Sequence, residues 1–301
     1  MIHKKLQGTA RIILLGAATV FLCAMSILFL TPIVLTLTNS FMSQTEIASN
    51  YGKIFDSVTS AGTYVSERVN LKIIPDLVSF SQYETVLLRS PDYLLKFWNS
   101  VILVVPIVVF QTLVALLAAY GFARFDTKWR SGIFFAYIFL MLMPYQVTLV
   151  PNYLVADWLG ILDTRWAIIL PGIFSPFAVF ILTKFMRRIP SSVIEAAKLD
   201  GAGEWQIFTK ICAPMSGGIV ASVAILVYID YWNMVEQPLV LLTGEAEALH
   251  PLSVFLSKIN TGDAGVAFCV AAIYMIIPLL IFLYCEDYLV EGVSYSGGLK
   301  G

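Results

Sequence analysis

Six apolar runs, each long enough to cross a lipid bilayer, dominate this sequence. A bilayer core about 30 Å thick needs about 20 apolar residues in a helix. Within lipid, only helices and closed barrels satisfy all their backbone hydrogen bonds. The sequence therefore predicts an all-α membrane protein with six transmembrane helices, at residues 12–37, 98–123, 132–151, 166–186, 217–242 and 266–290.

The composition excludes a soluble enzyme. Hydrophobic residues make up 58% of the chain and charged residues only 13%, whereas about 25% of the residues of a soluble domain are charged. The net charge of −1 leaves no basic surplus for nucleic acid. The first run is too long for a cleaved signal peptide, so we interpret it as a membrane anchor. The cysteines have no metal-ligand spacing, and we predict no metal site: Cys23, Cys212, Cys269 and Cys285.

Lys and Arg residues indicate the orientation, because they gather in cytoplasmic loops. With the N-terminus inside, 12 of the 19 Lys and Arg residues are cytoplasmic, and the short outer loops hold only Arg165 and Lys258. Both termini, residues 1–11 and 291–301, are then predicted in the cytoplasm. The remaining bases lie in residues 38–97, an outer segment that we interpret as a small subdomain with an amphipathic helix at Tyr83–Leu95, or as a loose loop.

The most informative cytoplasmic segment is residues 189–214. Ser192 and Glu195 have the spacing of a capping box at a helix start. Gly201 suits the left-handed residue that ends a helix. Trp205 and Phe208 then begin an apolar stripe typical of a short amphipathic helix. The segment is predicted to form two short helices joined by a glycine turn.

This segment also resembles a known sequence motif. Glu195-Ala196-Ala197, then Gly201, Ile211 and Ala213-Pro214 resemble the EAA loop of ABC importer permeases. The family has Leu before the proline where this chain has Ala213. From about residue 95 onward the chain is similar to the smaller permease subunit of maltose-type importers, and residues 289–301 resemble the tail of carbohydrate permeases.

The resemblance implies a type I ABC importer permease fold with a core domain at about 95–290. Residues 193–203 would form the coupling helix that docks into an ATPase subunit, with Glu195 facing a basic residue there. The alternative for Glu195 is the capping box alone. The residues that would couple to the ATPase are Glu195, Ala196, Ala197, Asp200 and Gly201.

The chain has no phosphate-binding loop of its own. No G-x-x-x-x-G-K-[ST] motif is present, so we expect no cofactor in this chain and expect ATP and Mg²⁺ to be bound by a separate ATPase. The resemblance further implies a second homologous permease, an extracytoplasmic solute-binding protein and a sugar substrate. The expected location is a bacterial or archaeal cell membrane, with several passes through the lipid.

Polar side chains within the apolar runs are candidates for the substrate path, because such residues are costly in a membrane. Asp230, Asn233 and Gln237 have the spacing of one helical stripe, and aromatic rings with amide or carboxylate partners suit a sugar. Hydrogen bonding between helices is the alternative role. Prolines near Tyr145 are expected to kink the third run. The path candidates are Asp230, Tyr231, Trp232, Asn233, Glu236, Tyr145 and Gln146.

Two other functions stay open on the sequence. A permease for glycerol phosphate or a polyamine would keep the EAA loop and change the pore. A secondary transporter coupled to an ion gradient would use carboxylates such as Asp230 and Glu236, but would leave the loop unexplained. A membrane enzyme is disfavoured, since the chain has only His3 and His250.

Overall fold

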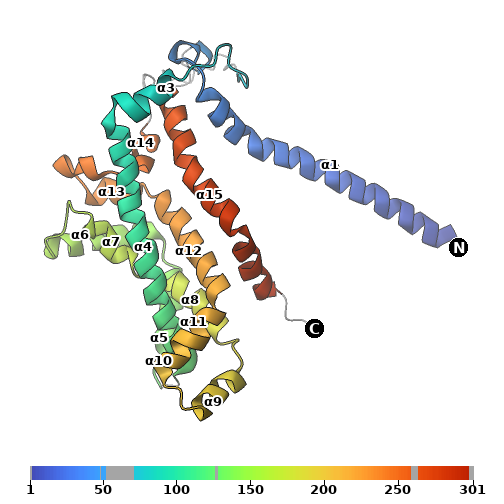
Figure 1. The fold of residues 1–301 in the computed structure, drawn as a ribbon, viewed down its shortest axis with the longest axis vertical. Helices are drawn as coiled ribbons and strands as arrows, with labels where there is room; N and C mark the ends of the chain where they lie inside the picture. The colour runs from blue at the N-terminus through green and yellow to red at the C-terminus, as the bar shows by residue number, and fades with distance from the viewer. Residues whose placement is uncertain (1, 48, 52–70, 126–127, 259–263, 298–301) are drawn as a thin grey trace. The chain divides into compact units, whose positions relative to one another are not determined.

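The structure is a computed structural model of the 301-residue chain. It describes residues 2–47, 49–51, 71–125, 128–258 and 264–297, and every element in these ranges is helical. The chain divides into two compact units (Figure 1). Unit 1 comprises residues 1–91 and 259–273, and unit 2 comprises residues 92–258 and 274–301.

Four helices are long and apolar enough to cross a membrane by themselves: Leu14–Asn39, Pro91–Arg124, Trp166–Met186 and Gly265–Glu286. They cover four of the six apolar runs. The run at 132–151 has a kink next to Pro144, as the sequence predicts, whereas the run at 217–242 is not the single helix that was expected. The first is bent by 104° between Arg130–Met141 and Tyr145–Trp158. The second divides into Gly217–Trp232 and Glu236–Leu241, and the 72° bend where Glu204–Met215 meets Gly217–Trp232 lies before it. The described residues thus hold four candidate spans, or up to six if each bent pair counts as one.

Unit 1 joins a long helix to a small packed segment. Its helices are α1 (Ile2–Asn39), α3 (Ser81–Glu84), the π-helical turn η1 (Thr85–Arg89) and the first turns of α15 (Ala264–Gly297). Buried Met42, Ile47 and Tyr51 form its core, with Phe268 of α15 packed against them. The described part of the outer segment is therefore packed, whereas residues 52–70 lie outside the described residues.

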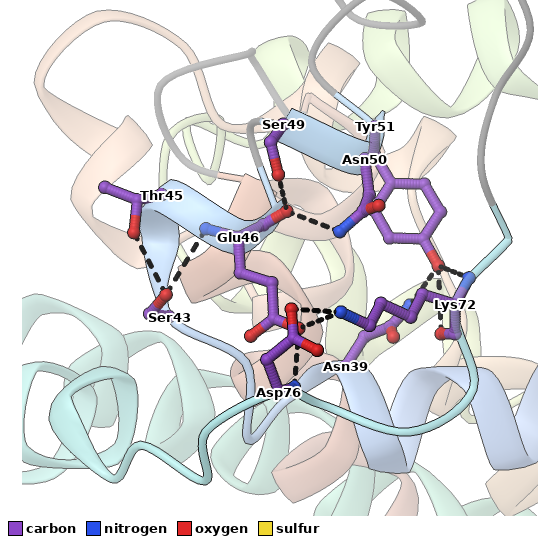
Figure 2. Close-up of polar contacts among 9 residues, drawn as sticks. All are labelled: Asn39, Ser43, Thr45, Glu46, Ser49, Asn50, Tyr51, Lys72 and Asp76. Carbon is purple, nitrogen blue, oxygen red and sulfur yellow. Dashed lines mark hydrogen bonds and ion pairs between the residues drawn. The ribbon is translucent and has the colours of Figure 1, made fainter.

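Polar contacts fix the chain around this core (Figure 2). The Tyr51 hydroxyl accepts a hydrogen bond from the backbone N–H of Lys72 at 3.2 Å and one from Asn39 Nδ2 at 3.0 Å. Glu46 Oε1 lies 3.1 Å from Lys72 Nζ and accepts from the backbone N–H of Asp76 at 2.8 Å. Two segments separated by more than twenty residues are thereby held together.

The single amphipathic helix expected at Tyr83–Leu95 is wrong. Ser90 is extended, with φ −121° and ψ 103°, and separates η1 from α4 (Pro91–Arg124). The reason is Pro91, because a proline ring clashes with a helical conformation of the residue before it.

In unit 2, α4 runs from one end to the other (Figure 1). Its buried side chains recur every four residues, at Leu103, Ile107, Gln111, Ala115 and Ala119, which is the spacing of one helical face. Outside residues 189–216, the other helices between residues 125 and 258 are α5 (Arg130–Met141), α6 (Tyr145–Trp158), α7 (Trp166–Gly172), α8 (Pro176–Met186), α12 (Gly217–Trp232), α13 (Glu236–Leu241), the 3₁₀ turn η3 (Gly244–Leu249) and α14 (Leu252–Ser257), as far as the structure describes these residues.

A polar network fixes the start of α4 to distant loops. Asn99 Oδ1 accepts a hydrogen bond from Arg165 Nη2 at 2.7 Å, and Asn99 Nδ2 donates to the carbonyl of Ala248 at 2.8 Å. One residue on, Ser100 Oγ accepts from the backbone N–H of Leu252 at 2.9 Å. Asn99 is 5% exposed, so the groups that it pairs would be left unsatisfied without it.

We expect Asn99→Ala to lower the free energy of unfolding by about 1–3 kcal/mol, because it removes the hydrogen-bond partner of the half-buried Arg165 guanidinium and of the buried His250 carbonyl. The measurement is the thermal unfolding midpoint of the detergent-solubilised chain. The matched control is Gln111→Leu in the same helix, because Gln111 is 1% exposed and its Oε1 has no partner within the described ranges. The control should leave the midpoint unchanged or raise it, and equal losses in both variants would contradict the prediction.

Candidate functional site

The segment at 189–214 forms short helices joined by a glycine turn, as the sequence predicts, but its first helix begins at a different residue. It comprises α9 (Ser191–Leu199), α10 (Glu204–Ile207), the π turn η2 (Phe208–Cys212) and α11 (Ala213–Met215). We call this segment the α9 hairpin. The capping box at Ser192 and Glu195 is wrong. Pro190 is the N-cap residue and α9 has no side-chain cap, so Ser192 already lies inside the helix. The proline ring fixes a φ of −57° next to the first helical residue, so the helix begins two residues earlier than predicted.

The turn after α9 is a Schellman motif. Gly201 has a φ of +80°, in the left-handed region that favours glycine. Its N–H donates to the carbonyl of Lys198 at 3.0 Å, and the N–H of Ala202 donates to the carbonyl of Ala197 at 3.0 Å. These two bonds satisfy carbonyls at the helix end. The Gly203 N–H then donates to Gln206 Oε1 at 3.1 Å and fixes the start of α10.

The hairpin presents α9 outward. Of the nine residues of α9, only Ile194 is buried. The predicted coupling residues Glu195, Ala196, Asp200 and Gly201 are exposed, and Ala197 is half-buried. The large apolar side chains beside them are exposed as well: Leu199 is 90% exposed and Trp205 is 68% exposed. Exposed large apolar side chains such as these, at one end of unit 2 (Figure 1), are typical of a surface that binds another molecule.

A cavity of about 370 Å³ lies where the helices of unit 2 are broken. Pro144 is the N-cap of α6. Between α7 and α8, Ser175 caps α8 by accepting a hydrogen bond from the Ala178 N–H at 3.3 Å. The cavity is lined by Leu140, Met141, Met143, Tyr145, Thr148, Asn152, Pro171, Gly172, Phe174, Ser175, Pro176, Phe177, Tyr231, Gln237 and Leu241.

Two of the predicted path residues line this cavity, Tyr145 and Tyr231. The Tyr231 hydroxyl donates a long hydrogen bond to the backbone carbonyl of Gly172, at 3.5 Å. Gln146 does not line the cavity. Its Nε2 donates to the Glu236 carboxylate at 3.2 Å, so these two path candidates bind one another.

The predicted stripe of Asp230, Asn233 and Gln237 is wrong. α12 ends at Trp232, Asn233 is its C-cap residue, and α13 begins only at Glu236, so the three residues do not share one helix. Asp230 and Asn233 are exposed and do not line the cavity.

Trp232 belongs to the core of unit 2. It is 1% exposed, and its ring stacks on Tyr228 at 5.2 Å and on Tyr274 at 4.9 Å. The Tyr274 hydroxyl also donates to the backbone carbonyl of Trp232. An indole held in this way does not face a path, so we remove it from the path set.

The sequence reasoning missed several polar lining residues, among them Thr148, Asn152 and Ser175. Their signal was present. Tyr145, Thr148 and Asn152 have the spacing i, i+3 and i+7 of one helical face, but of these only Tyr145 is among the predicted path residues. Gln237 was seen, but it was assigned to the wrong helix.

Relatives and a solved structure agree with this architecture. The chain is similar to the arabinooligosaccharides transport system permease protein AraQ of Bacillus subtilis (strain 168), at 27% identity over 95% of each chain. It is 33% identical to the polygalacturonan/rhamnogalacturonan transport system permease protein YtcP of the same organism, over 67% of this chain and 69% of that one. It is also 33% identical to the osmoprotective compounds uptake permease protein GgtD of Synechocystis sp., over 71% and 72%.

A chain from the crystal structure of a bacterial ABC transporter that imports the acidic polysaccharide alginate has the same fold, with a TM-score of 0.70 and 24% identity over 90% of this chain and 94% of that one. The model of the family described as the binding-protein-dependent transport system inner membrane component matches residues 85–294. The chain therefore belongs to that family of membrane permease subunits.

Proposed function

We propose that this chain is one of two permease subunits of an ATP-driven carbohydrate importer and forms half of its alternating-access pore. The observation that carries this proposal is the exposed α9 hairpin, in which the Gly201 turn holds Glu195, Ala196 and Asp200 on an open surface. A pair of ATPase subunits, which bind ATP and Mg²⁺, would grip α9. An extracytoplasmic binding protein would deliver the sugar.

The proposed topology has six spans and both termini in the cytoplasm of a bacterium or archaeon. The spans are α1, α4, the bent pair of α5 and α6, the pair of α7 and α8, the run at 217–242 that begins with α12, and α15. An even number of spans places both ends on one side, and the bias of Lys and Arg places that side in the cytoplasm. α9 then lies on the face where ATP is available.

The carbohydrate assignment rests on the relatives and on the cavity. AraQ and YtcP are named for oligosaccharide and polysaccharide transport. The cavity combines aromatic rings with hydroxyl and amide groups, and none of its lining residues is charged. Such a surface suits a neutral, hydroxylated solute. It disfavours glycerol phosphate and polyamines, which need a charged partner when desolvated.

The ion-coupled alternative receives no support from the site. Asp230 and Glu236 do not line the cavity, and Glu236 accepts a hydrogen bond from Gln146. The exposed α9 surface would also have no purpose in a transporter that is driven by an ion gradient.

We expect Gly201→Val to abolish co-purification of the ATPase, because a β-branched residue at a φ of +80° costs about 1–2 kcal/mol or more and distorts the turn. The measurement is the amount of ATPase that remains bound to the chain in mild detergent. The matched control is Gly203→Val, because Gly203 has an ordinary φ of −74° and a Cβ there also meets no atom within 4 Å. Full ATPase binding by the Gly201 variant would contradict the docking role.

We expect Tyr231→Phe to lower kcat/KM for sugar uptake by about two- to tenfold, the effect of one lost hydrogen bond. The assay is uptake by proteoliposomes that hold the assembled transporter, with radiolabelled arabino-oligosaccharides and malto-oligosaccharides as the probes. The control is Tyr153→Phe, because Tyr153 is 39% exposed and does not line the cavity.

Equal uptake by both tyrosine variants would contradict a substrate path through the cavity. Uptake of only glycerol phosphate or spermidine, tested alongside the sugars, would contradict the carbohydrate assignment.

A further inference from the structure

The α9 hairpin is tied to α4 through one carboxylate. Glu204, the first residue of α10, lies with its Oε1 2.8 Å from Lys198 Nζ in α9. Its other oxygen, Oε2, accepts a hydrogen bond from the Tyr120 hydroxyl of α4 at 2.6 Å. The Tyr120 hydroxyl also lies 3.3 Å from the backbone carbonyl of Glu204. A single side chain thus spans from the docking helix to a membrane helix.

The two halves of this link differ in their surroundings. The Lys198 and Glu204 side chains are 54% and 43% exposed, and an exposed pair of this kind adds little to stability. Tyr120 is 6% exposed and its ring packs on Phe208 at 5.1 Å. The short bond from a phenol to a carboxylate is charge-assisted and directional. The two contacts of Glu204 therefore fix the position of the α9 hairpin relative to α4 and contribute little to the stability of the fold.

α4 continues this link to the cavity. Tyr120 lies 13 residues after Ile107, which is about 20 Å along a helix. Side-chain carbons of Ile107 lie 3.1 Å from the position that a Cβ would occupy at Gly172, and Gly172 lines the cavity. A shift of α4 along its axis would press Ile107 against the break between α7 and α8, since packed interiors transmit displacement.

We infer that Glu204 is a positioning residue, which converts movement of α9 into movement of α4 through Tyr120 and so couples ATP hydrolysis to opening of the cavity. This inference rests on the proposed function and adds to it a specific route from the ATPase to the pore. The docking surface grips the ATPase, whereas Glu204 transmits the displacement that follows.

The test measures coupling separately from assembly. The transporter is assembled with its ATPase and binding protein in proteoliposomes, and both ATP hydrolysis and uptake of the radiolabelled oligosaccharides are measured. Tyr120→Phe and Glu204→Gln should each retain the ATPase and its basal activity, while the sugar imported per ATP falls about fivefold or more, the size of a typical coupling effect.

The double variant should be no worse than either single variant, because both remove the same contact. Lys198→Met provides a second route to the same result, since it detaches Glu204 from α9 and leaves the bond to Tyr120. The matched control is Tyr137→Phe, whose ring packs on Phe122 of α4 at 5.6 Å. This control should couple like the unmodified chain.

Normal import per ATP in Tyr120→Phe and Glu204→Gln would overturn the inference. Additive losses in the double variant would also overturn it, because the two residues would then act separately. Failure of the unmodified chain to bind an ATPase would overturn the proposed function, and the inference with it.

Discussion

The structure of unit 2 depends on how backbone groups are satisfied where helices break within apolar surroundings. A bilayer offers no water to an exposed N–H or carbonyl, so irregular backbone is tolerated only where protein or a cavity satisfies it. At the break after α7, Ser175 Oγ accepts the N–H of Ala178, and the Tyr231 hydroxyl faces the carbonyl of Gly172. The groups that satisfy the breaks are the same groups that give the cavity its polar lining, which explains why the two coincide.

The α9 hairpin also satisfies its backbone groups locally. The last carbonyls of α9 are satisfied by backbone N–H groups of the Gly201 turn, so the helix ends without help from neighbouring side chains. The exposed side chains of α9 are therefore not needed to cap the helix. Leu199 at 90% exposure can serve a partner without any loss to the fold of the chain itself.

The sequence predicted elements wherever one physical rule dominated. Long apolar runs gave the four unbroken or mildly broken spans, and Gly201 gave the left-handed turn. The predictions were incomplete where two rules compete. At 132–151, hydropathy favours a continuous helix, but Pro144 begins a new one and the chain bends by 104°. Apolar content contains no information on the direction of a bend.

The candidate site likewise has features that the sequence predicts and features that it does not. In α9 only Ile194 is buried, whereas Val193 and Leu199 are exposed, so apolar character alone does not predict which face of this helix is buried. Which polar residues meet at the cavity depends on where the helices break. Tyr145 and Tyr231 line it, whereas the predicted stripe that starts at Asp230 does not form because α12 ends at Trp232. Trp232 has the chemistry of a sugar-binding ring, but its stacking on Tyr228 and Tyr274 uses both of its faces for packing.

The cost of burying a charge limits which side chain of α4 can bind the α9 hairpin. A Lys or Asp deep in α4 would be costly in lipid. An apolar contact would not fix a direction, because hydrophobic contacts are non-directional. Tyrosine combines an apolar ring with a polar tip and is suited to the boundary between the two environments. Tyr120 buries its ring against Phe208 and directs its hydroxyl to Glu204. The ion pair stays outside with Lys198, so a directional bond reaches α4 without placing a charge in the membrane.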